Sequence, residues 1–565
     1  MKTVLKYIKP YMFPFVFCLL IKAVSAFSEL AIPRMLAVII DENVPASDMR
    51  AVLINGAYML LFALLTFLFN VIGNKISAHV TGKISRDLRH DLFEKTVRLD
   101  AVATDKIGLS SLTSRLTSDT YNIMNFLARI QRLGIKAPLM LVGGVIVTLT
   151  IDVRLALILI AILPLVCIVV YKITKRSIPI YNEEQRILDK LVRRVDETAS
   201  GIRVIKALSK TEYEKKRFSN TSKELADKEI EAGRVMSLTK PVNDFIFYMG
   251  LCIVILVGYF MAEGDGSAAA GKLLAFMTYF TIILNNMIMM SRIFVQTSRA
   301  ISSASRIEEV LLIESELVNE DSSEEREGYI VFENVTFSYN KIMPNLKNVS
   351  FTLARGETLG IIGATGSGKS TLINLLLRLY DPDSGNIYID GKNIKSISKE
   401  KLYSMFGAAF QNDFIPAATV GENIAFFRDV DETDVARAIE ISQAKDFIDA
   451  LEDGTDHAVT TRGTNISGGQ KQRLLIARAV AASPDILILD DSSSALDYKT
   501  DKELRRAIKE RIDTTTVIVS QRIASVMWAD KILVIDEGEV IAEGKHEELL
   551  VSCKEYRDIA EVQQR

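Results

Sequence analysis

Cysteine and histidine are both scarce in this sequence, with four of each among 565 residues. Three cysteines lie inside apolar stretches and the fourth lies near the C-terminus, at spacings that fit neither a disulfide framework nor a metal site. We therefore expect the cysteines to be packing residues. They are Cys18, Cys167, Cys252 and Cys553.

Long stretches of the first half lack charge, although 24% of all residues are charged and the mean hydropathy is +0.20. A helix needs about 20 residues to span the apolar core of a bilayer, and each stretch reaches that length with its flanks. Six such helices in a soluble protein would need an implausibly large dry core, so we predict six transmembrane helices. The stretches are Ala51–Asn74, Ala137–Ile151, Leu155–Tyr171, Phe245–Ala262, Leu273–Ser291 and the interrupted Tyr11–Ile40.

The short connections between these stretches lack lysine and arginine, whereas the long ones are rich in both. The short connections are Asp41–Asp48, Ile151–Val153 and Glu263–Gly271, and the long ones lie around Lys75–Lys106 and Lys172–Arg234. Because cytoplasmic loops carry an excess of Lys and Arg, we predict a multi-pass protein of the cell (inner) membrane with cytoplasmic N- and C-termini. Met1–Pro10 leads to no small-residue cleavage site, so we interpret it as an interfacial elbow rather than a signal peptide.

The predicted helices continue well beyond the bilayer on the cytoplasmic side. Helical patterning runs over about Asn74–Arg98 and about Lys172–Lys206 without turn punctuation. Each long connection must still reverse, and we place the reversals near Asp100–Ser111 and Thr211–Ser219. Short transverse helices there could contact a soluble domain.

Several ionisable residues fall within the apolar stretches. Such residues are costly in a membrane and usually face the bundle interior or a wet cavity. Lys22 and Glu29 are seven residues apart and share a helix face, and Asp244 begins the fifth apolar run. A cavity-facing role stays open for these three, against snorkelling, which we expect for Arg34 and Lys136.

The chain changes character after the acidic, polar run Glu314–Gly328. We interpret this run as a linker (residues 314–328) between a transmembrane domain, residues 1–313, and a soluble domain, residues 329–565. Short strand-like runs in the soluble domain alternate with helical stretches, as expected of an α/β domain. These runs are Ile330–Phe332, Thr358–Ile362, Ile486–Leu489, Thr516–Val519 and Lys531–Ile535.

A phosphate-binding loop follows one of these strands. Residues Gly363–Ser370, with the sequence GATGSGKS, fit the pattern GxxxxGK[ST] between a strand-like run and the helical run Ser370–Leu377. Backbone N–H groups of such a glycine-rich turn approach phosphate oxygens, and the helix N-terminus adds positive potential. We expect Lys369 to bridge the β- and γ-phosphates and Ser370 to ligate magnesium. The predicted fold class is thus a polytopic all-α transmembrane domain of six helices fused to an α/β P-loop ATPase domain.

Further motifs occur in order along the chain. They are Tyr339 after the run VTFS, Gln411 after AAF, the run Ile466–Gln470 (ISGGQ), Asp490 after ILIL, the run Ser494–Asp497 (SALD), and the segments Gly201–Ala207 and Ala304–Leu311. With the phosphate loop, they make the chain resemble, over essentially its whole length, an ABC transporter of the exporter type. The chain is similar to a half-transporter, in which the membrane domain is fused ahead of an ABC ATPase domain.

The resemblance implies ATP and Mg²⁺ as cofactors and a role for each motif. Tyr339 would stack on adenine, Gln411 would lie near magnesium, and the signature Ser467–Gln470 would contact the γ-phosphate held by the opposite ATPase domain. The implied nucleotide ligands are Tyr339, Gly363, Thr365, Gly366, Ser367, Gly368, Lys369, Ser370, Thr371, Gln411, Asp490 and Asp497, with Ser467, Gly468, Gly469 and Gln470 acting in trans. The implied magnesium ligands are Ser370, Gln411 and Asp490.

The chain departs from the family pattern at two hydrolytic positions. The family has a glutamate after the strand aspartate and a histidine on the switch loop, where this chain has Asp491 and Gln521. General-base help contributes about 10²–10⁴-fold to a rate, so we predict a degenerate catalytic site that binds ATP well and cleaves it poorly. None of the four histidines follows the strand-like run Val517–Val519, so none can replace the missing one. The alternative is neutral drift in a working ATPase.

A third departure, Thr461 in place of a glutamate before the signature, puts the usual contact with the partner's membrane domain in doubt. We predict the degenerate subunit of a heterodimer whose partner is a second half-transporter with intact glutamate and histidine. Its substrates would be amphipathic drugs or lipids, and no nucleic acid is implied. The alternatives are a regulatory or channel-like ATP-binding membrane subunit, a slow homodimeric exporter, and an importer with the exporter architecture.

Overall fold

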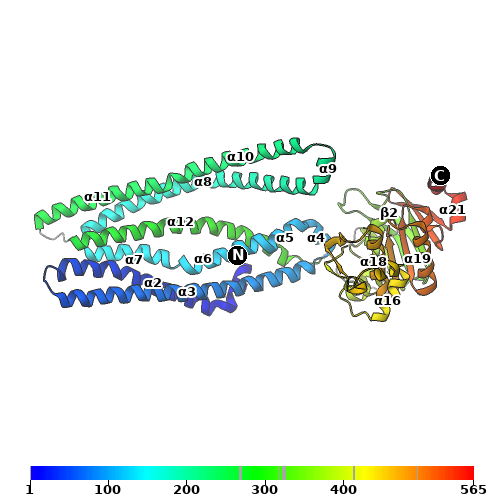
Figure 1. Cartoon of the computed structure of the whole chain (residues 1–565), viewed down its shortest axis with the longest axis horizontal. Helices are drawn as coiled ribbons and strands as arrows, with labels where there is room; N and C mark the ends of the chain where they lie inside the picture. The colour runs from blue at the N-terminus through cyan, green and yellow to red at the C-terminus, as the bar shows by residue number, and fades with distance from the viewer. Residues whose placement is uncertain are drawn as a thin grey trace. The chain divides into compact units, whose positions relative to one another are not determined.

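The computed structural model describes residues 2–265, 270–315, 317, 319–320, 326–411, 414–492 and 494–564. It divides into two compact units (Figure 1). The helical unit comprises Met1–Arg98 and Gly108–Ile313, and the α/β unit comprises Leu99–Ile107 and Glu314–Arg565. Part of the expected linker, residues 316, 318 and 321–325, lies outside the described residues.

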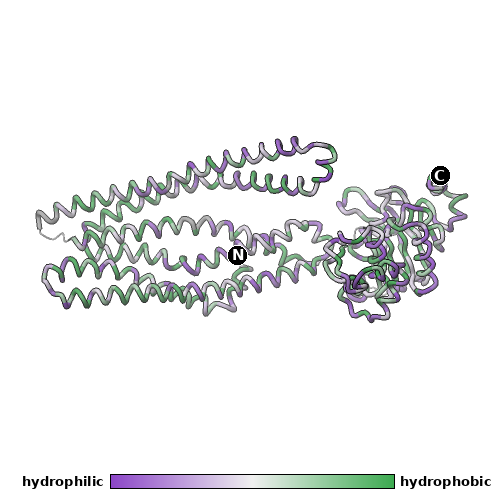
Figure 2. Tube along the Cα trace, in the orientation of Figure 1, coloured by the Kyte–Doolittle hydropathy of each residue, from purple (hydrophilic) through white to green (hydrophobic). Residues whose placement is uncertain are grey.

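The helical unit is built from long helices, and six of its described helical segments are long and apolar enough to cross a membrane. The helices are α1 (Lys2–Ile8), α2 (Met12–Val38), α3 (Met49–Val97), α5 (Leu109–Ser114), α6 (Thr120–Leu133), α7 (Lys136–Ile151), α8 (Val153–Ser200), α9 (Ile202–Ala207), α10 (Thr211–Ser237), α11 (Thr239–Asp265) and α12 (Ala270–Leu312). The prediction of six membrane-spanning helices is confirmed. The long helices become more polar toward the end at which α9 lies (Figure 2).

The second reversal predicted between the long helices lies earlier than the sequence predicts. The chain turns at Gly201–Lys210, around α9, and the expected turn at Thr211–Ser219 is wrong because those residues form the first turns of α10. Gly201 ends α8 at φ −90°, and Ser209 adopts a left-handed conformation (φ 52°) that closes the turn. The first reversal falls where expected, and its short helix α4 (Ala101–Ile107) belongs to the α/β unit.

Two charged residues inside the apolar helices have internal partners. Lys22 is buried, and its ammonium donates to the side-chain oxygens of Asn70 at 2.9 Å and Asn74 at 3.0 Å. Lys22 therefore joins α2 to α3, and the cavity-facing alternative does not hold for it in this chain. Lys136 pairs with Glu29 at 2.6 Å, so the expected snorkelling of Lys136 is wrong. A charge in a membrane is costly unless it is paired, which explains both arrangements.

The predicted roles of Arg34 and Asp244 stay predictions, and Asp41 takes a capping role that the sequence did not indicate. Arg34 is exposed and donates to the Thr150 hydroxyl at 3.5 Å, and Asp244 is half-buried in α11, where a cavity-facing role stays a prediction. Asp41 caps the first turn of α12, because its carboxylate accepts from the backbone N–H groups of Gly271 at 2.6 Å and Lys272 at 2.7 Å. This cap satisfies helix donors that would otherwise lack partners. All four cysteines are free. Cys18 and Cys553 are buried, as expected of packing residues, whereas Cys167 and Cys252 are exposed.

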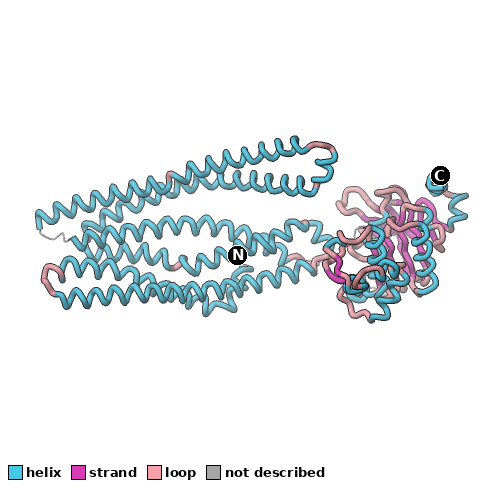
Figure 3. The backbone as a smooth tube through the Cα atoms, viewed as in Figure 1, coloured by secondary structure: helices cyan, strands magenta, loops and turns pink. Residues whose placement is uncertain are grey.

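The strands of the described structure all lie in the α/β unit (Figure 3). One sheet has the order β2 (Leu346–Leu353), β1 (Ile330–Phe337), β4 (Ser384–Ile389), β5 (Lys392–Asn393). The larger sheet has the order β12 (Glu539–Gly544), β11 (Lys531–Asp536), β3 (Thr358–Ile362), β10 (Thr515–Ser520), β9 (Ile486–Asp490), β6 (Phe406–Ala409), and β7 (Ala418–Thr419) pairs with β8 (Ala458–Val459). Each of the five expected strand-like runs lies within a strand, and the predicted fold class is confirmed.

Helices cover both faces of the larger sheet. In β9, Leu487 and Leu489 belong to one apolar cluster, whereas Ile486 and Ile488 belong to another. Because side chains alternate across a strand, this strand is buried on both faces, as its unbroken apolar run suggests. The helices of the unit are α4, α13 (Lys369–Leu376), α14 (Lys399–Ser404), α15 (Val420–Ala425), α16 (Glu432–Ile441), α17 (Lys445–Asp449), α18 (Gly468–Ala481), α19 (Tyr498–Arg511), α20 (Ile523–Val526), α21 (His546–Ser552) and α22 (Lys554–Gln564).

Candidate functional site

Four neighbouring parallel strands direct their carboxyl ends to one edge of the larger sheet. In spatial order they are β3, β10, β9 and β6, and all the pairings among them are parallel. The phosphate loop follows β3, Gln521 follows β10, Asp490 ends β9, and Gln411 follows β6. Segments more than 150 residues apart in the chain therefore meet at this edge, where ligands of open α/β sheets bind.

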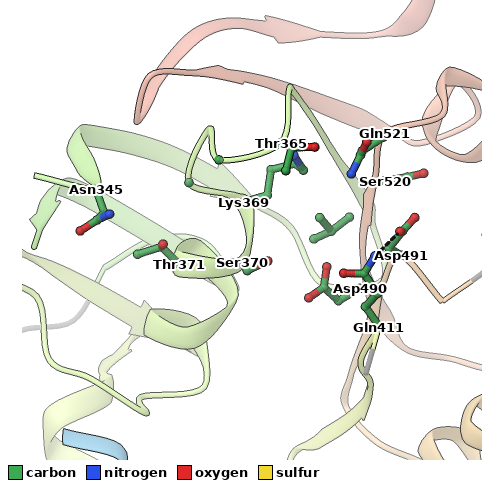
Figure 4. Close-up of a pocket in the computed structure, with 13 residues that line it drawn as sticks. Asn345, Thr365, Lys369, Ser370, Thr371, Gln411, Asp490, Asp491, Ser520 and Gln521 are labelled. Atoms are coloured by element: carbon green, nitrogen blue, oxygen red, sulfur yellow. Dashed lines mark hydrogen bonds between the residues drawn. The ribbon is translucent and has the colours of Figure 1, made fainter. Parts of the chain in front are cut away.

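A cavity of about 260 Å³ lies at this edge (Figure 4). Its lining residues are Asn345, Thr365, Gly366, Gly368, Lys369, Ser370, Thr371, Gln411, Asp490, Asp491, Val519, Ser520 and Gln521. The structure thus brings together most of the residues expected around the phosphates. Asn345, Val519 and Ser520 were not expected from the sequence to line this site. The position of Ser520 directly before Gln521 was a signal, whereas nothing local marks Asn345.

The phosphate loop wraps around its lysine. The ammonium of Lys369 donates to the carbonyl oxygens of Gly363 at 2.8 Å and Ala364 at 2.7 Å. Burial lowers the pKa of Lys369, and the carboxylates of Asp490 and Asp491 oppose that shift. Gly368 adopts φ +107°, and a Cβ there would lie 2.8 Å from the Asn345 carbonyl oxygen, so only glycine suits the position.

Two carboxylates close the other side of the cavity. Burial raises the pKa of Asp490, and the neighbouring Asp491 raises it further. Burial also raises the pKa of Asp491, against the lowering effects of Arg522, Lys369 and a hydrogen bond from Gln411. That bond runs from Gln411 Nε2 to Asp491 Oδ2 at 2.9 Å and is visible in Figure 4.

Asp491 leaves the strand in a left-handed conformation, with φ +48°. Its N–H still donates to the Val519 carbonyl of β10 at 2.8 Å, so the backbone is fixed beside the end of β10. Asp and Asn tolerate this conformation better than most residues. The left-handed turn sets the starting direction of the Asp491 side chain.

The chemistry of the cavity fits magnesium and phosphate. Hydroxyl, carboxylate and amide oxygens of Ser370, Asp490 and Gln411 line it, and oxygen ligands are those that Mg²⁺ prefers. The hydroxyl oxygen of Ser367, within the phosphate loop, is buried without a hydrogen-bond partner in the described structure. An anion at the loop would give such a group a partner.

Tyr339 does not line this cavity and lies beside it. Its ring contacts those of Phe337 and Tyr380 edge-on, with centroids 4.9 Å and 5.0 Å away. Its hydroxyl accepts from Asn374 at 3.0 Å, and its backbone N–H donates to the side chain of Asn345 at 3.2 Å. Tyr339 therefore has one partly exposed ring face in a fixed orientation.

The signature residues lie outside the cavity, at the N-terminus of α18. Ser467 caps that helix in a reciprocal arrangement with Gln470, whose side chain accepts from the Ser467 N–H at 2.8 Å. Within α18, Gln472 donates to the Ser494 hydroxyl at 3.0 Å and accepts from Ala495 N–H at 2.7 Å. The loop before Asp497, which caps α19, is thereby tied to the signature helix.

Each of the two units resembles a known protein family. Residues 15–287 match the profile of the ABC transporter transmembrane region, and residues 346–494 match that of the ABC transporter. The uncharacterized ABC transporter ATP-binding protein YfiB of Bacillus subtilis is 35% identical, over 100% of this chain and 98% of YfiB. The chain belongs to the ABC transporter family.

Other members of the family extend the comparison. The ABC transporter ATP-binding protein YknU of Bacillus subtilis is 33% identical, over 100% of this transporter chain and 97% of YknU. The structure of a bacterial Atm1-family ABC exporter with ATP bound matches with a TM-score of 0.82 at 22% identity, over 98% of this chain and 99% of that one. This ABC transporter subunit therefore has the fold of an ABC exporter.

Proposed function

We propose that this ABC transporter subunit is one half of a heterodimeric exporter of amphipathic compounds, drugs or lipids, from the cytoplasm or the inner leaflet. In this proposal the subunit holds Mg²⁺-ATP at its own phosphate loop, cleaves it slowly, and lends Ser467–Gln470 to the site of its partner. The observation that carries the proposal is the presence of Asp491 and Gln521 in a cavity that Lys369, Ser370, Asp490 and Gln411 also line.

The position of Asp491 supports slow hydrolysis. A glutamate would carry its carboxylate farther into the cavity by one C–C bond, about 1.5 Å. Asp491 Oδ2 accepts a hydrogen bond from Gln411, so one oxygen of the shorter carboxylate already has a protein partner. A misplacement of about 1 Å can cost about 100-fold in rate.

Gln521 supports the same conclusion on the other side of the cavity. Its amide can donate and accept hydrogen bonds, but it cannot carry charge or relay a proton as histidine does. Lys369, Ser370 and Asp490 would hold Mg²⁺-ATP, and the bound metal ion would neutralise charge on the phosphates. Binding should therefore survive while the chemical step slows.

The location of the signature supports its action on a partner. Ser467–Gln470 do not line the cavity formed by the phosphate loop of the same chain. The exposed N-terminus of α18 is a ready-made site for an anion. In a head-to-tail dimer this helix would face the γ-phosphate bound by the partner.

The test is co-expression of this subunit with a half-transporter that has the intact glutamate and histidine, followed by nucleotide trapping. After several turnovers we expect ATP at the Lys369 site and ADP at the partner's site, with directional transport of an amphipathic dye in inverted vesicles. Lys369→Ala is the control that removes nucleotide from this site. A homodimer that transports and turns over many ATP per second would contradict the proposal, whereas retained ATP without directional flux would favour the regulatory or channel-like alternative.

A further inference from the structure

We propose that Gln563 on α22 is a positioning residue that sets the orientation of Gln521, an inference that rests on the proposed function. Gln521 and Arg522 form the switch loop between β10, which ends at Ser520, and α20, which begins at Ile523. The side-chain oxygen of Gln563 accepts from the backbone N–H of Ile523 at 2.8 Å. The side-chain nitrogen of Gln563 donates to the backbone carbonyl of Gln521 at 2.7 Å.

These two bonds hold the loop on both sides of one residue. Arg522 lies between the bonded groups, and its own N–H donates to the Ser520 hydroxyl at 3.0 Å. The backbone from Gln521 to Ile523 is thus held by side chains of Gln563 and Ser520. Since the Gln521 carbonyl is fixed, the direction in which the Gln521 side chain leaves the backbone is restricted, and that residue lines the cavity.

The placement of Gln563 follows from the packing of α22. Tyr556 and Ala560 are buried in the apolar core. Ala560 lies at i+4 and Gln563 at i+7 from Tyr556, so the three residues share one helix face. Tyr556 is further anchored by a 2.8 Å hydrogen bond between its hydroxyl and His546. The buried part of this stripe ends at Ala560, and the exposed Gln563 continues it at the surface, where its amide meets the first residue of α20.

The bonds also stabilise a short helix. α20 has four residues, and Ile523 is its first. N–H groups in the first turn of a helix lack partners within the helix, and Arg522 at the N-cap position supplies no side-chain cap. Gln563 fills that role from a distant part of the chain.

The test measures how strongly the full-length protein, in lipid nanodiscs, prefers ATP over ADP. In the proposed function, the switch loop contacts the γ-phosphate, so it contributes to the affinity for ATP. ADP lacks the γ-phosphate and is held by the phosphate loop alone. Gln563→Leu should weaken ATP binding by about threefold to tenfold, as expected for two lost hydrogen bonds, and leave ADP binding within about twofold. Gln563→Glu, which keeps the size and the acceptor but removes the donor to the Gln521 carbonyl, should weaken ATP binding in the same direction but by less. The exposed neighbour Val562 supplies the control Val562→Ala.

A double-mutant cycle with Gln521→Ala shows whether Gln563 acts through Gln521. If it does, Gln563→Leu should have no further effect on ATP binding once Gln521 is alanine. Additive effects, or equal losses of ATP and ADP binding together with a lower melting temperature, would reduce Gln563 to a structural residue and overturn the inference. Unchanged ATP preference in Gln563→Leu would also overturn it, while leaving the proposed function intact. A parent protein that does not bind ATP would overturn both.

Discussion

At the scale of single residues, Asp491 combines two constraints. Its left-handed backbone (φ +48°) favours a short polar residue, whereas the proposed function requires a longer carboxylate at this place in the cavity for fast hydrolysis. Aspartate meets the first constraint, and the proposed function attributes slow hydrolysis to the second.

Replacing Asp491 by glutamate should restore part of the missing hydrolysis, up to about 100-fold, because the carboxylate regains its reach. Gln521→His alone should restore less, since it cannot compensate for a misplaced base, and the double variant should exceed the product of the two. The measurement is the ATPase rate in complexes whose other site is disabled. Asp491→Asn, which has no carboxylate, is the control and should stay slow. A double variant as slow as the parent would place the defect in the partner's signature.

The raised pKa of Asp490 predicts a pH-dependent stability. A carboxyl whose folded pKa is raised costs stability when charged, so its cost is present above the raised pKa and disappears below the unfolded value of about 3.9. Without nucleotide and Mg²⁺, Asp490→Asn should therefore raise the melting temperature at pH 8, and the gain should shrink as the pH falls toward about 4. Asp513→Asn, at an exposed site, is the control. An equal gain at every pH would contradict the assignment.

At the scale of elements, the N-terminus of the signature helix α18 lies outside the cavity of its own chain. Its N-terminal residues are exposed, and its interior Gln472 holds the loop before α19. A Cβ added to Gly468 would meet only the Ala495 side chain, at an ordinary 3.9 Å. Substitution there should therefore leave the fold of this chain intact.

Gly468→Asp should impair hydrolysis at the partner's site by at least about 100-fold and leave nucleotide binding at the Lys369 site nearly unchanged. A negative charge at this helix N-terminus would repel the phosphate held by the partner. Ser467→Ala should have a smaller effect in the same direction, because it removes one hydroxyl without adding charge. The measurement is ATPase of the assembled complex together with nucleotide affinity at each site. Equal losses at both sites would argue against action in trans.

At the scale of the whole molecule, the short helix α4 lies in one unit although its neighbours in sequence belong to the other. Residues Leu99–Ile107 lie between two parts of the helical unit in sequence but belong to the α/β unit in space. Two hydrogen bonds hold α4 there. Ser315 donates to Asp100 at 2.9 Å, and Tyr380 donates to Asp105. Burial and the bond to Asp105 both raise the pKa of Tyr380.

Tyr380→Phe should loosen α4 while keeping the aromatic packing against Tyr339. We expect nucleotide binding within about twofold of the parent and a clear loss, about threefold or more, in the stimulation of ATPase by transported substrate, since one charge-assisted hydrogen bond is worth about 1.5 kcal/mol or more. Asp105→Asn, which retains an acceptor oxygen, should be milder. If nucleotide affinity fell while the stimulation of ATPase by substrate stayed unchanged, Tyr380 would instead support Tyr339 in the binding of adenine.

The sequence by itself determined the elements and the motifs. Apolar runs of bilayer length predict the six spans, and the unbroken run of β9 predicts a strand buried on both faces, because both patterns are local consequences of burial. The glycine loop is equally local, since its backbone geometry depends on the residues within it. The antiparallel strands β2, β4 and β12 were not expected, because their alternating or short runs resemble ordinary surface loops.

Only the tertiary structure decided which distant residues meet. The order β3, β10, β9, β6 brings Lys369, Gln521, Asp491 and Gln411 to one edge, and no local pattern encodes strand order. The same holds for the pairing of Lys136 with Glu29, for the position of α9, and for Gln563 beside the switch loop. Polar side chains such as these find partners wherever packing leaves a donor or acceptor unsatisfied, and that choice depends on the whole fold.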